Sequence, residues 1–146
     1  MVPGPKSVIA ITPISKTNGA TATGEYIDTK GWDYADIAVI AGTADVVSNT
    51  LSVLKIEEGD TTSSFATFAG AVQNTDFTVA TNAYTSTANG QNVWKFGVDT
   101  RGRKRYLRVS ASPQTTMVIG AVATLSRGGK MPSSASEAGS LNAVYV

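Results

Sequence analysis

Three neighbouring segments between residues 93 and 125 alternate apolar with polar or small side chains, and this pattern restricts the fold more than any other. The apolar faces are, in chain order, Trp94, Phe96 and Val98; Leu107, Val109 and Ala111; and Ile119, Ala121, Ala123 and Leu125. In a strand, alternate side chains point to opposite faces, so the pattern has a period of two residues. In a helix, side chains return to the same face after about 3.6 residues. The pattern therefore predicts three strands, and their closeness in sequence favours a three-stranded meander.

Shorter segments earlier in the chain have the same character. Residues 34–41 and 51–57 are rich in β-branched side chains and predict two further strands, and residues 76–80 predict a short one. Residues 65–72 are ambiguous, because their apolar positions also fit a helical period although Gly70 and the short length favour a turn. Strands about ten residues apart, without helical stretches between them, predict an all-β fold: an antiparallel β-sandwich or barrel of jelly-roll-like type.

The two ends differ in composition from the strand-rich body, which we place at residues 25–126. Residues 1–24 are interrupted by prolines and loop residues, so we expect an extended N-terminal arm. Within it, residues 7–12 predict one short strand at a sheet edge, because Pro13 cannot donate a hydrogen bond to a ladder.

The C-terminal tail, residues 127–146, begins with a stretch rich in Gly and Ser and ends in the apolar, β-prone residues 141–146. A polar tether that carries such a segment is consistent with strand addition to a neighbouring molecule. The alternatives are a frayed terminus and a last strand that returns to its own sheet.

The sequence contains no cysteine and no histidine. These absences exclude disulfides, thiolate metal sites and cysteine nucleophiles, and they remove the commonest general base and every Ser-His-Asp arrangement. No apolar run reaches the roughly 18 residues that a membrane helix needs, and the first residues lack the features of a secretory signal. We therefore expect no enzymatic activity, no cofactor, no metal site and no membrane partner.

The net charge of +1 conceals an uneven distribution along the chain. Residues 1–100 contain five Lys and Arg against ten Asp and Glu, a balance of −5, and residues 101–146 contain seven against one, a balance of +6. Such asymmetry indicates charge-complementary partners. Two explanations stay open: the halves neutralise each other within one fold, or they join separate copies.

The basic excess is concentrated in one predicted hairpin. Its cationic residues are Arg101, Arg103, Lys104, Arg105 and Arg108. Three interpretations compete: contacts with acidic residues of a partner subunit, a solvated hairpin tip, or a nucleic-acid patch with Tyr106 for base stacking. Nucleic acid is the least favoured, because the overall charge is near neutral and the cluster is confined to one hairpin.

The acidic residues lie mostly between positions 25 and 60. Their spacing lacks the alternating ligands of a calcium loop, so we assign them to an interface with the basic hairpin of a neighbouring copy in a closed ring. The interface residues predicted here are Asp33, Asp36, Glu57, Glu58 and Asp60, together with Tyr145 in the C-terminal tail.

Three stretches of the body carry a resemblance to a known group of proteins. Residues 31–45 (GWDYADIAVIAGTAD), 54–62 (LKIEEGDTT) and 98–113 (VDTRGRKRYLRVSASP) resemble small proteins carried in the structural modules of tailed bacteriophages and prophages. The resemblance extends over about residues 25–126. Small β-rich proteins of this kind often decorate or cement the capsid, which implies a structural virion protein that binds and stabilises a phage capsid.

The resemblance also implies partners and a location. It points to the major capsid protein and to further copies of the chain, for which we expect a trimer, on the exterior of a capsid assembled in the host cytoplasm. One alternative is another virion component, such as a head–tail connector or a tail protein. A second alternative is a glycan-binding module that stacks sugars on Trp32, although aromatic residues on strands are more often part of the core.

Overall fold

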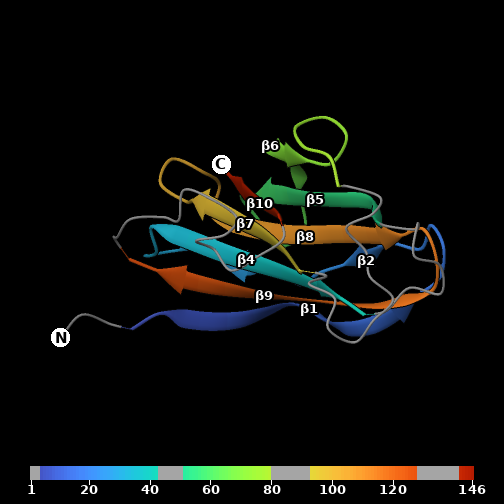
Figure 1. The fold of residues 1–146 in the computed structure, drawn as a ribbon. Helices are drawn as coiled ribbons and strands as arrows, with labels where there is room; N and C mark the ends of the chain where they lie inside the picture. Colours follow the sequence, from blue (N-terminus) through green and yellow to red (C-terminus); the bar gives the residue numbers. More distant parts are fainter. Residues whose placement is uncertain (1–3, 43–50, 80–92, 128–141) are drawn as a thin grey trace.

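The computed structural model describes residues 4–42, 51–79, 93–127 and 142–146, and within these ranges the chain forms strands and no helix (Figure 1). The strands are β1 (Lys6–Lys16), β2 (Ala22–Thr23), β3 (Ile27–Asp28), β4 (Tyr34–Ala41), β5 (Leu51–Gly59), β6 (Ala66–Val72), β7 (Val93–Asp99), β8 (Tyr106–Pro113), β9 (Met117–Ser126) and β10 (Asn142–Tyr145). The expectation of an all-β fold is confirmed. A search of the same residues for a helix that could span a membrane finds none.

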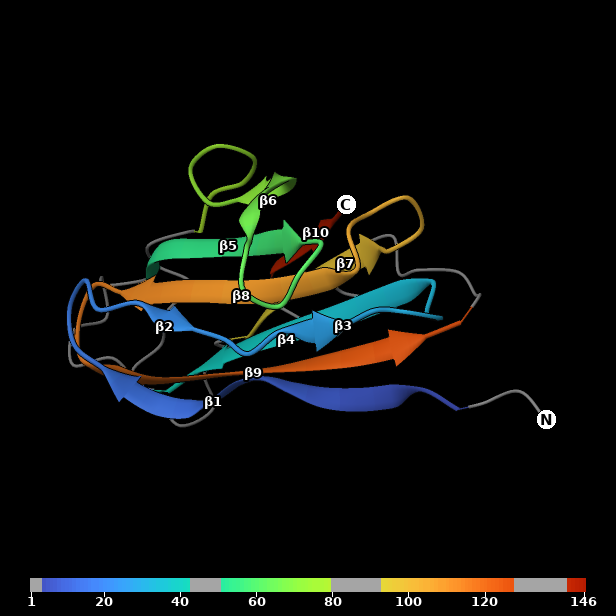
Figure 2. The same cartoon turned by 180° about the vertical axis from the view of Figure 1, so that it is seen from behind.

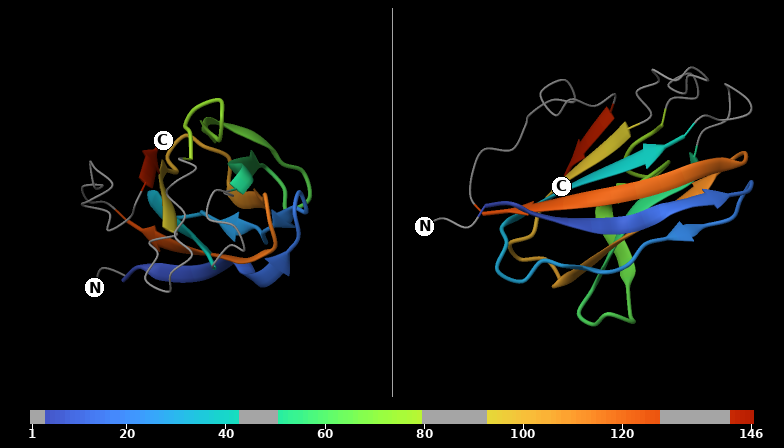
Figure 3. Two further views of the ribbon diagram at one scale, coloured as in Figure 1. Left: turned by 45° about the vertical axis from the view of Figure 1, so that its right-hand side comes forward. Right: turned by 90° about the horizontal axis from the view of Figure 1, so that it is seen from below.

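The strands form two sheets that pack as the layers of a β-sandwich (Figures 1 and 3). Sheet A has the order β1-β9-β4-β7-β10, and sheet B has the order β2-β8-β5-β6. The short strand β3 also pairs with β8, in line with β2 (Figure 2). Neighbouring strands run antiparallel throughout the described ranges, except that β10 runs parallel to β7. These pairings support a sandwich and do not confirm a jelly-roll.

The predicted meander is wrong in its pairing, although its three strands are present as β7, β8 and β9. Strands β7 and β9 flank β4 in sheet A, and β8 lies in sheet B. The links at residues 100–105 and 114–116 therefore cross the gap between the layers, which is about 10 Å in a sandwich. Alternation shows which face of a strand is buried, but it does not show which strand lies beside it.

Strand β1 confirms the edge strand expected before Pro13, and it is longer than predicted. It pairs with β9 alone among the described strands, and the register shifts between Ile11 and Ile14, where Pro13 lies. Residues 6–16 thus belong to sheet A, and so do residues 142–145 in β10. The extended terminal arms are not confirmed for these residues, and positions 1–3 and 128–141 lie outside the described ranges.

Two further expectations for the body are corrected. Residues 66–72 form the strand β6 rather than the turn that the sequence favoured, and Gly70 within it has a φ of +96°. Residues 76–79 show only an isolated bridge between Gln73 and Phe77 instead of the expected short strand, and Ala80 is outside the described residues.

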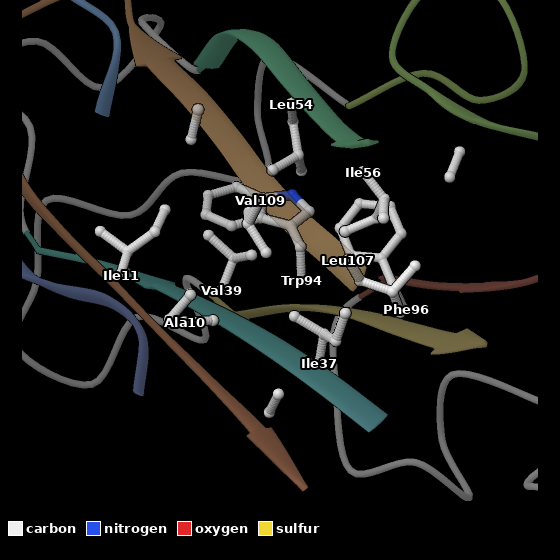
Figure 4. Packing of buried hydrophobic residues seen from close by; sticks show 14 of the residues in the cluster. Ala10, Ile11, Ile37, Val39, Leu54, Ile56, Trp94, Phe96, Leu107 and Val109 are labelled. Atoms are coloured by element: carbon white, nitrogen blue, oxygen red, sulfur yellow. The ribbon is translucent and has the colours of Figure 1, made fainter. Parts of the chain in front are cut away.

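The core lies between the inward faces of the two sheets (Figure 4). Its fully buried members include Ile37 and Val39 of β4, Leu54 and Ile56 of β5, Phe96 of β7, and Leu107 and Val109 of β8. The Phe96 ring also packs edge-to-face on Phe77, with 5.6 Å between ring centroids. The period-two faces identified in the sequence are therefore the faces that meet in this layer.

Replacing a core side chain on β5 tests this assignment. We expect Leu54→Ala to lower the free energy of unfolding by about 2–5 kcal/mol, because it removes buried methyl groups and leaves a cavity. The neighbouring Val53 is 37% exposed, so Val53→Ala should cost less than about 1 kcal/mol. Urea denaturation measures both values, and equal losses would contradict the inward orientation of Leu54.

Candidate functional site

The basic residues do not form the predicted hairpin, because β7 and β8 lie in different sheets. They lie on the link between these strands and at the start of β8, and they pair with acidic residues of the same chain. Arg105 of this link donates to both carboxylate oxygens of Asp28 at 2.9 and 2.7 Å, and Lys104 lies 3.2 Å from Asp60. Arg101 makes a two-point contact with Asp99, at 2.9 Å from Nε to Oδ1 and 2.6 Å from Nη2 to Oδ2. The complementary halves of the sequence thus neutralise each other locally, which is the first of the two explanations that the sequence left open.

The strand order explains this pairing. Because β8 lies between β3 and β5 in sheet B, Asp28 is the register partner of Tyr106 and Glu57 is the register partner of Arg108. A charge-based contact with a neighbouring copy, as predicted for these residues, would have to compete with bonds already formed in the chain. The pairs between Arg105 and Asp28 and between Arg101 and Asp99 hold the pKa of each carboxyl group at about 2.

Glu57 is the centre of the most buried ionic cluster. It is 8% exposed, and its Oε1 lies 2.8 Å from Lys55 Nζ. Its Oε2 accepts hydrogen bonds from Arg108 Nε and Nη2, at 2.9 and 2.8 Å, and from the Ser110 hydroxyl at 3.0 Å. Burial alone raises the pKa of Glu57, but the hydrogen bonds from these three side chains outweigh it and hold the pKa below its ordinary value.

All five arginines of the sequence lie with the guanidinium carbon over an aromatic ring. The carbon-to-centroid distances are 5.3 Å for Arg101 over Tyr34, 4.2 Å for Arg103 over Phe68, 4.8 Å for Arg105 over Tyr106, 4.2 Å for Arg108 over Phe65 and 5.5 Å for Arg127 over Trp32. Such contacts occur roughly once per 70–80 residues in other proteins. The link between β7 and β8 is therefore held against the body by aromatic rings as well as by carboxylates.

These contacts occupy the aromatic rings that the sequence offered for stacking. Tyr106 meets Arg105 and also packs edge-to-face on Tyr26, with 5.6 Å between centroids. Trp32 is partly buried against the core and lies under Arg127, whose Nε donates to the Gly31 carbonyl at 2.7 Å. Neither ring is presented as an open platform for a base or a sugar.

The remaining predicted interface residues are scattered. Asp36 lies 3.4 Å from Lys95 on the outer face of sheet A, and Glu58 accepts a hydrogen bond from the Lys104 backbone at 3.2 Å. The backbone of Asp33 donates to the Ser126 carbonyl at 3.0 Å. Tyr145 is in β10, but its side chain is outside the described part of the chain. Among the described residues, no group of three or more acidic side chains is placed to hold a metal.

The structure adds an apolar surface that the sequence analysis missed. On the outer face of sheet A, Ile9 of β1, Ile40 of β4, and Val118 and Val122 of β9 are 59%, 49%, 48% and 39% exposed. The register places Ile9 beside Val122 and Ile40 beside Gly120. The strands thus present an apolar patch on the face that the alternating pattern turns away from the core.

Gly120 makes this patch concave. A Cβ at this position would lie 3.3 Å from Pro13 Cγ, so the absence of a side chain leaves a depression between β1, β9 and β4. The resulting hollow has a volume of about 410 Å³, and every residue that lines it is apolar or glycine. One signal in the sequence could have revealed it: the outward positions of β9 carry Val, Gly and Val where a solvated strand usually carries polar side chains.

Comparison with known proteins finds no match for this chain among protein-family models, curated proteins or solved structures.

Removing the charge of Glu57 tests the ionic cluster. We expect Glu57→Gln to lower the free energy of unfolding by about 2–4 kcal/mol, because Lys55 and Arg108 then lack their partly buried anion. Glu58→Gln, on the same strand, removes a carboxylate that accepts a hydrogen bond from the Lys104 backbone, and it should cost less than about 1 kcal/mol. Urea denaturation at pH 7 compares the two variants, and equal losses would contradict a special role for Glu57.

The lowered pKa of Glu57 also predicts how stability depends on pH. A carboxyl group with a depressed pKa in the fold stabilises the protein above its ordinary value of 4.5, and this contribution is lost as the pH falls toward the folded value. The melting temperature should therefore decline below about pH 5, and the decline should be smaller in Glu57→Gln. Calorimetry from pH 7 to pH 2 measures both profiles, and parallel profiles would exclude Glu57 as a source of the decline.

Proposed function

We propose that this protein is a structural virion protein that binds and stabilises a phage capsid, with the major capsid protein as its partner. The resemblance of residues 31–45, 54–62 and 98–113 to phage structural proteins supports this role. The observation that carries it is the apolar, hollowed outer face of sheet A. Exposed apolar patches rimmed by polar residues commonly mark protein–protein contacts.

The number of exposed apolar side chains on this face limits how tightly one copy can bind. Full burial of one Val or Ile side chain is worth about 1.5–3 kcal/mol, so covering the exposed half of four of them contributes on the order of 4 kcal/mol. That free energy corresponds to a dissociation constant of about 1 mM, before the entropic cost of association is subtracted. Stable decoration therefore requires several linked copies or additional contacts, which fits a homo-oligomer bound to a repeating lattice.

A charge placed in the hollow tests the proposal. We expect Val122→Asp to weaken binding to purified capsids of the phage that encodes the protein by at least about tenfold, because a carboxylate would be buried against an apolar partner. Val53→Asp is the matched control: Val53 is 37% exposed on β5, nearly the same as Val122 at 39%, but it lies in sheet B. Cosedimentation with expanded capsids measures binding, and melting of the capsid measures stabilisation.

A second variant tests the same hollow independently, in case Val122→Asp does not fold. Ile9→Asp alters the same hollow from the edge strand β1, where substitution disturbs only one ladder. Circular dichroism of each free variant establishes that its strands are retained. If Val122→Asp and Ile9→Asp bind capsids as well as the control Val53→Asp does, the hollow is not the contact surface. Failure of the unaltered protein to bind capsids would contradict the decoration role, and immunogold labelling confined to the neck or tail would identify another virion component instead.

A further inference from the structure

Strand β10 fills a slot along one edge of sheet A. It runs parallel to β7 in the register from Asn142 beside Trp94 to Tyr145 beside Gly97, and β7 is its one neighbour among the described strands (Figure 3). Just after the strand, the Val146 N–H donates to the Gly97 carbonyl at 2.9 Å, and the Asp99 N–H donates to the Val146 carbonyl at 2.8 Å. The slot therefore holds residues 142–146 mainly through the exposed backbone of β7.

The slot also accommodates particular side chains. Val144 and Val146 are partly buried and pack against the core. Gly70, on β6 of the opposite sheet, has a φ of +96°, and a Cβ built there would lie 2.9 Å from Val146 Cγ1. Glycine adopts this conformation without strain and leaves room for the valine. Backbone pairing combined with a fitted side chain is the recognition mode of strand addition.

The link that precedes β10 is longer than its path requires. Residues 127–141 join β9 to β10, and seven of the fourteen residues from 128 to 141 are Gly or Ser. Across sheet A, Asn142 pairs with Trp94, Trp94 with Val39, and Val39 with Ala121. Asn142 is therefore three strand spacings from β9, at the level of Ala121, which lies six positions before Arg127. These offsets amount to roughly 20 Å along the strands and 14 Å across them, or about 25 Å in a straight line. Fifteen Cα–Cα steps extend to about 50 Å, which is twice that distance.

We infer that the slot along β7 accepts residues 142–146 of a second copy of the chain as well as its own, so that copies exchange β10. The exchanged strand makes the same contacts in either copy, because the sequences are identical, and only the entropy of the link and the protein concentration decide between the two forms. This inference does not rest on the proposed capsid function.

The length of the link sets the concentration at which exchange occurs. For fourteen residues of this Gly- and Ser-rich composition, chain statistics give a root-mean-square length of about 20 Å, close to the span needed within one chain. The effective concentration of the chain's own strand is then in the millimolar range. Exchange is therefore a minor form in a dilute solution of about 10 µM, and it becomes substantial at about 1 mM or where copies are held side by side.

Engineered cysteines detect the exchange directly, because the natural sequence has none. Lys95 and Ala143 are register partners, and neighbouring strands are close enough for a disulfide. Full-length Lys95→Cys and full-length Ala143→Cys are mixed unfolded, refolded together and oxidised, at about 10 µM and at about 1 mM. We expect a mixed disulfide dimer, located by peptide mapping, whose yield rises with concentration.

Two controls make the outcome decisive. Lys95→Cys mixed with Ser7→Cys, which alters β1 at the other edge of sheet A, measures random crosslinking. At about 1 mM the matched pair should exceed this control by at least about fivefold, and an equal yield would overturn the inference. The double variant Lys95→Cys/Ala143→Cys should close a disulfide within one chain at about 10 µM. If it does not, β10 does not occupy the slot, and the inference fails with it.

Discussion

The burial of one apolar layer between two sheets is the constraint on which the other features of this protein depend. Strands β7, β8 and β9 each carry one apolar face, and all three could not bury that face if they lay side by side in a single exposed sheet. Placing β8 in sheet B turns Leu107 toward Ile37 and Phe96 of sheet A (Figure 4). The short links on either side of β8 are long enough to cross the gap, and the chain passes between the layers twice within about 20 residues.

This arrangement also determines where the charges go. With β8 held between β3 and β5, the basic residues at its start lie beside Asp28 and Glu57, although the two groups are about 50 to 80 positions apart in sequence. The near-zero net charge therefore reflects local pairing within the fold, strengthened by the aromatic ring under each guanidinium group. Because most of these charges are already matched, the exposed apolar face of sheet A is the stronger basis for a protein partner.

Sheet A presents two different surfaces for contact. The hollow centred on Gly120 lies over β1, β9 and β4, and the slot that holds β10 lies along β7 at the opposite edge. A partner bound at the hollow would leave the slot accessible to a second copy, so the proposed capsid contact and the inferred strand exchange are geometrically compatible. Exchange of β10 would connect neighbouring copies through their own chains. The weak contact that each copy makes with the capsid would then be reinforced by the contacts of its neighbours.

Sequence alone determined the all-β class, the positions of β4, β5, β7, β8 and β9, and the edge position of the strand before Pro13. These features follow from local chemistry: the period-two alternation of apolar residues and the missing N–H of proline belong to the chain whatever its fold. Only the tertiary structure decided the partner of each strand, the pairing of Arg105 with Asp28, the hollow at Gly120, and the return of β10 to β7. Each of these depends on contacts between distant positions, and alternation along a strand specifies its buried face without specifying its neighbour.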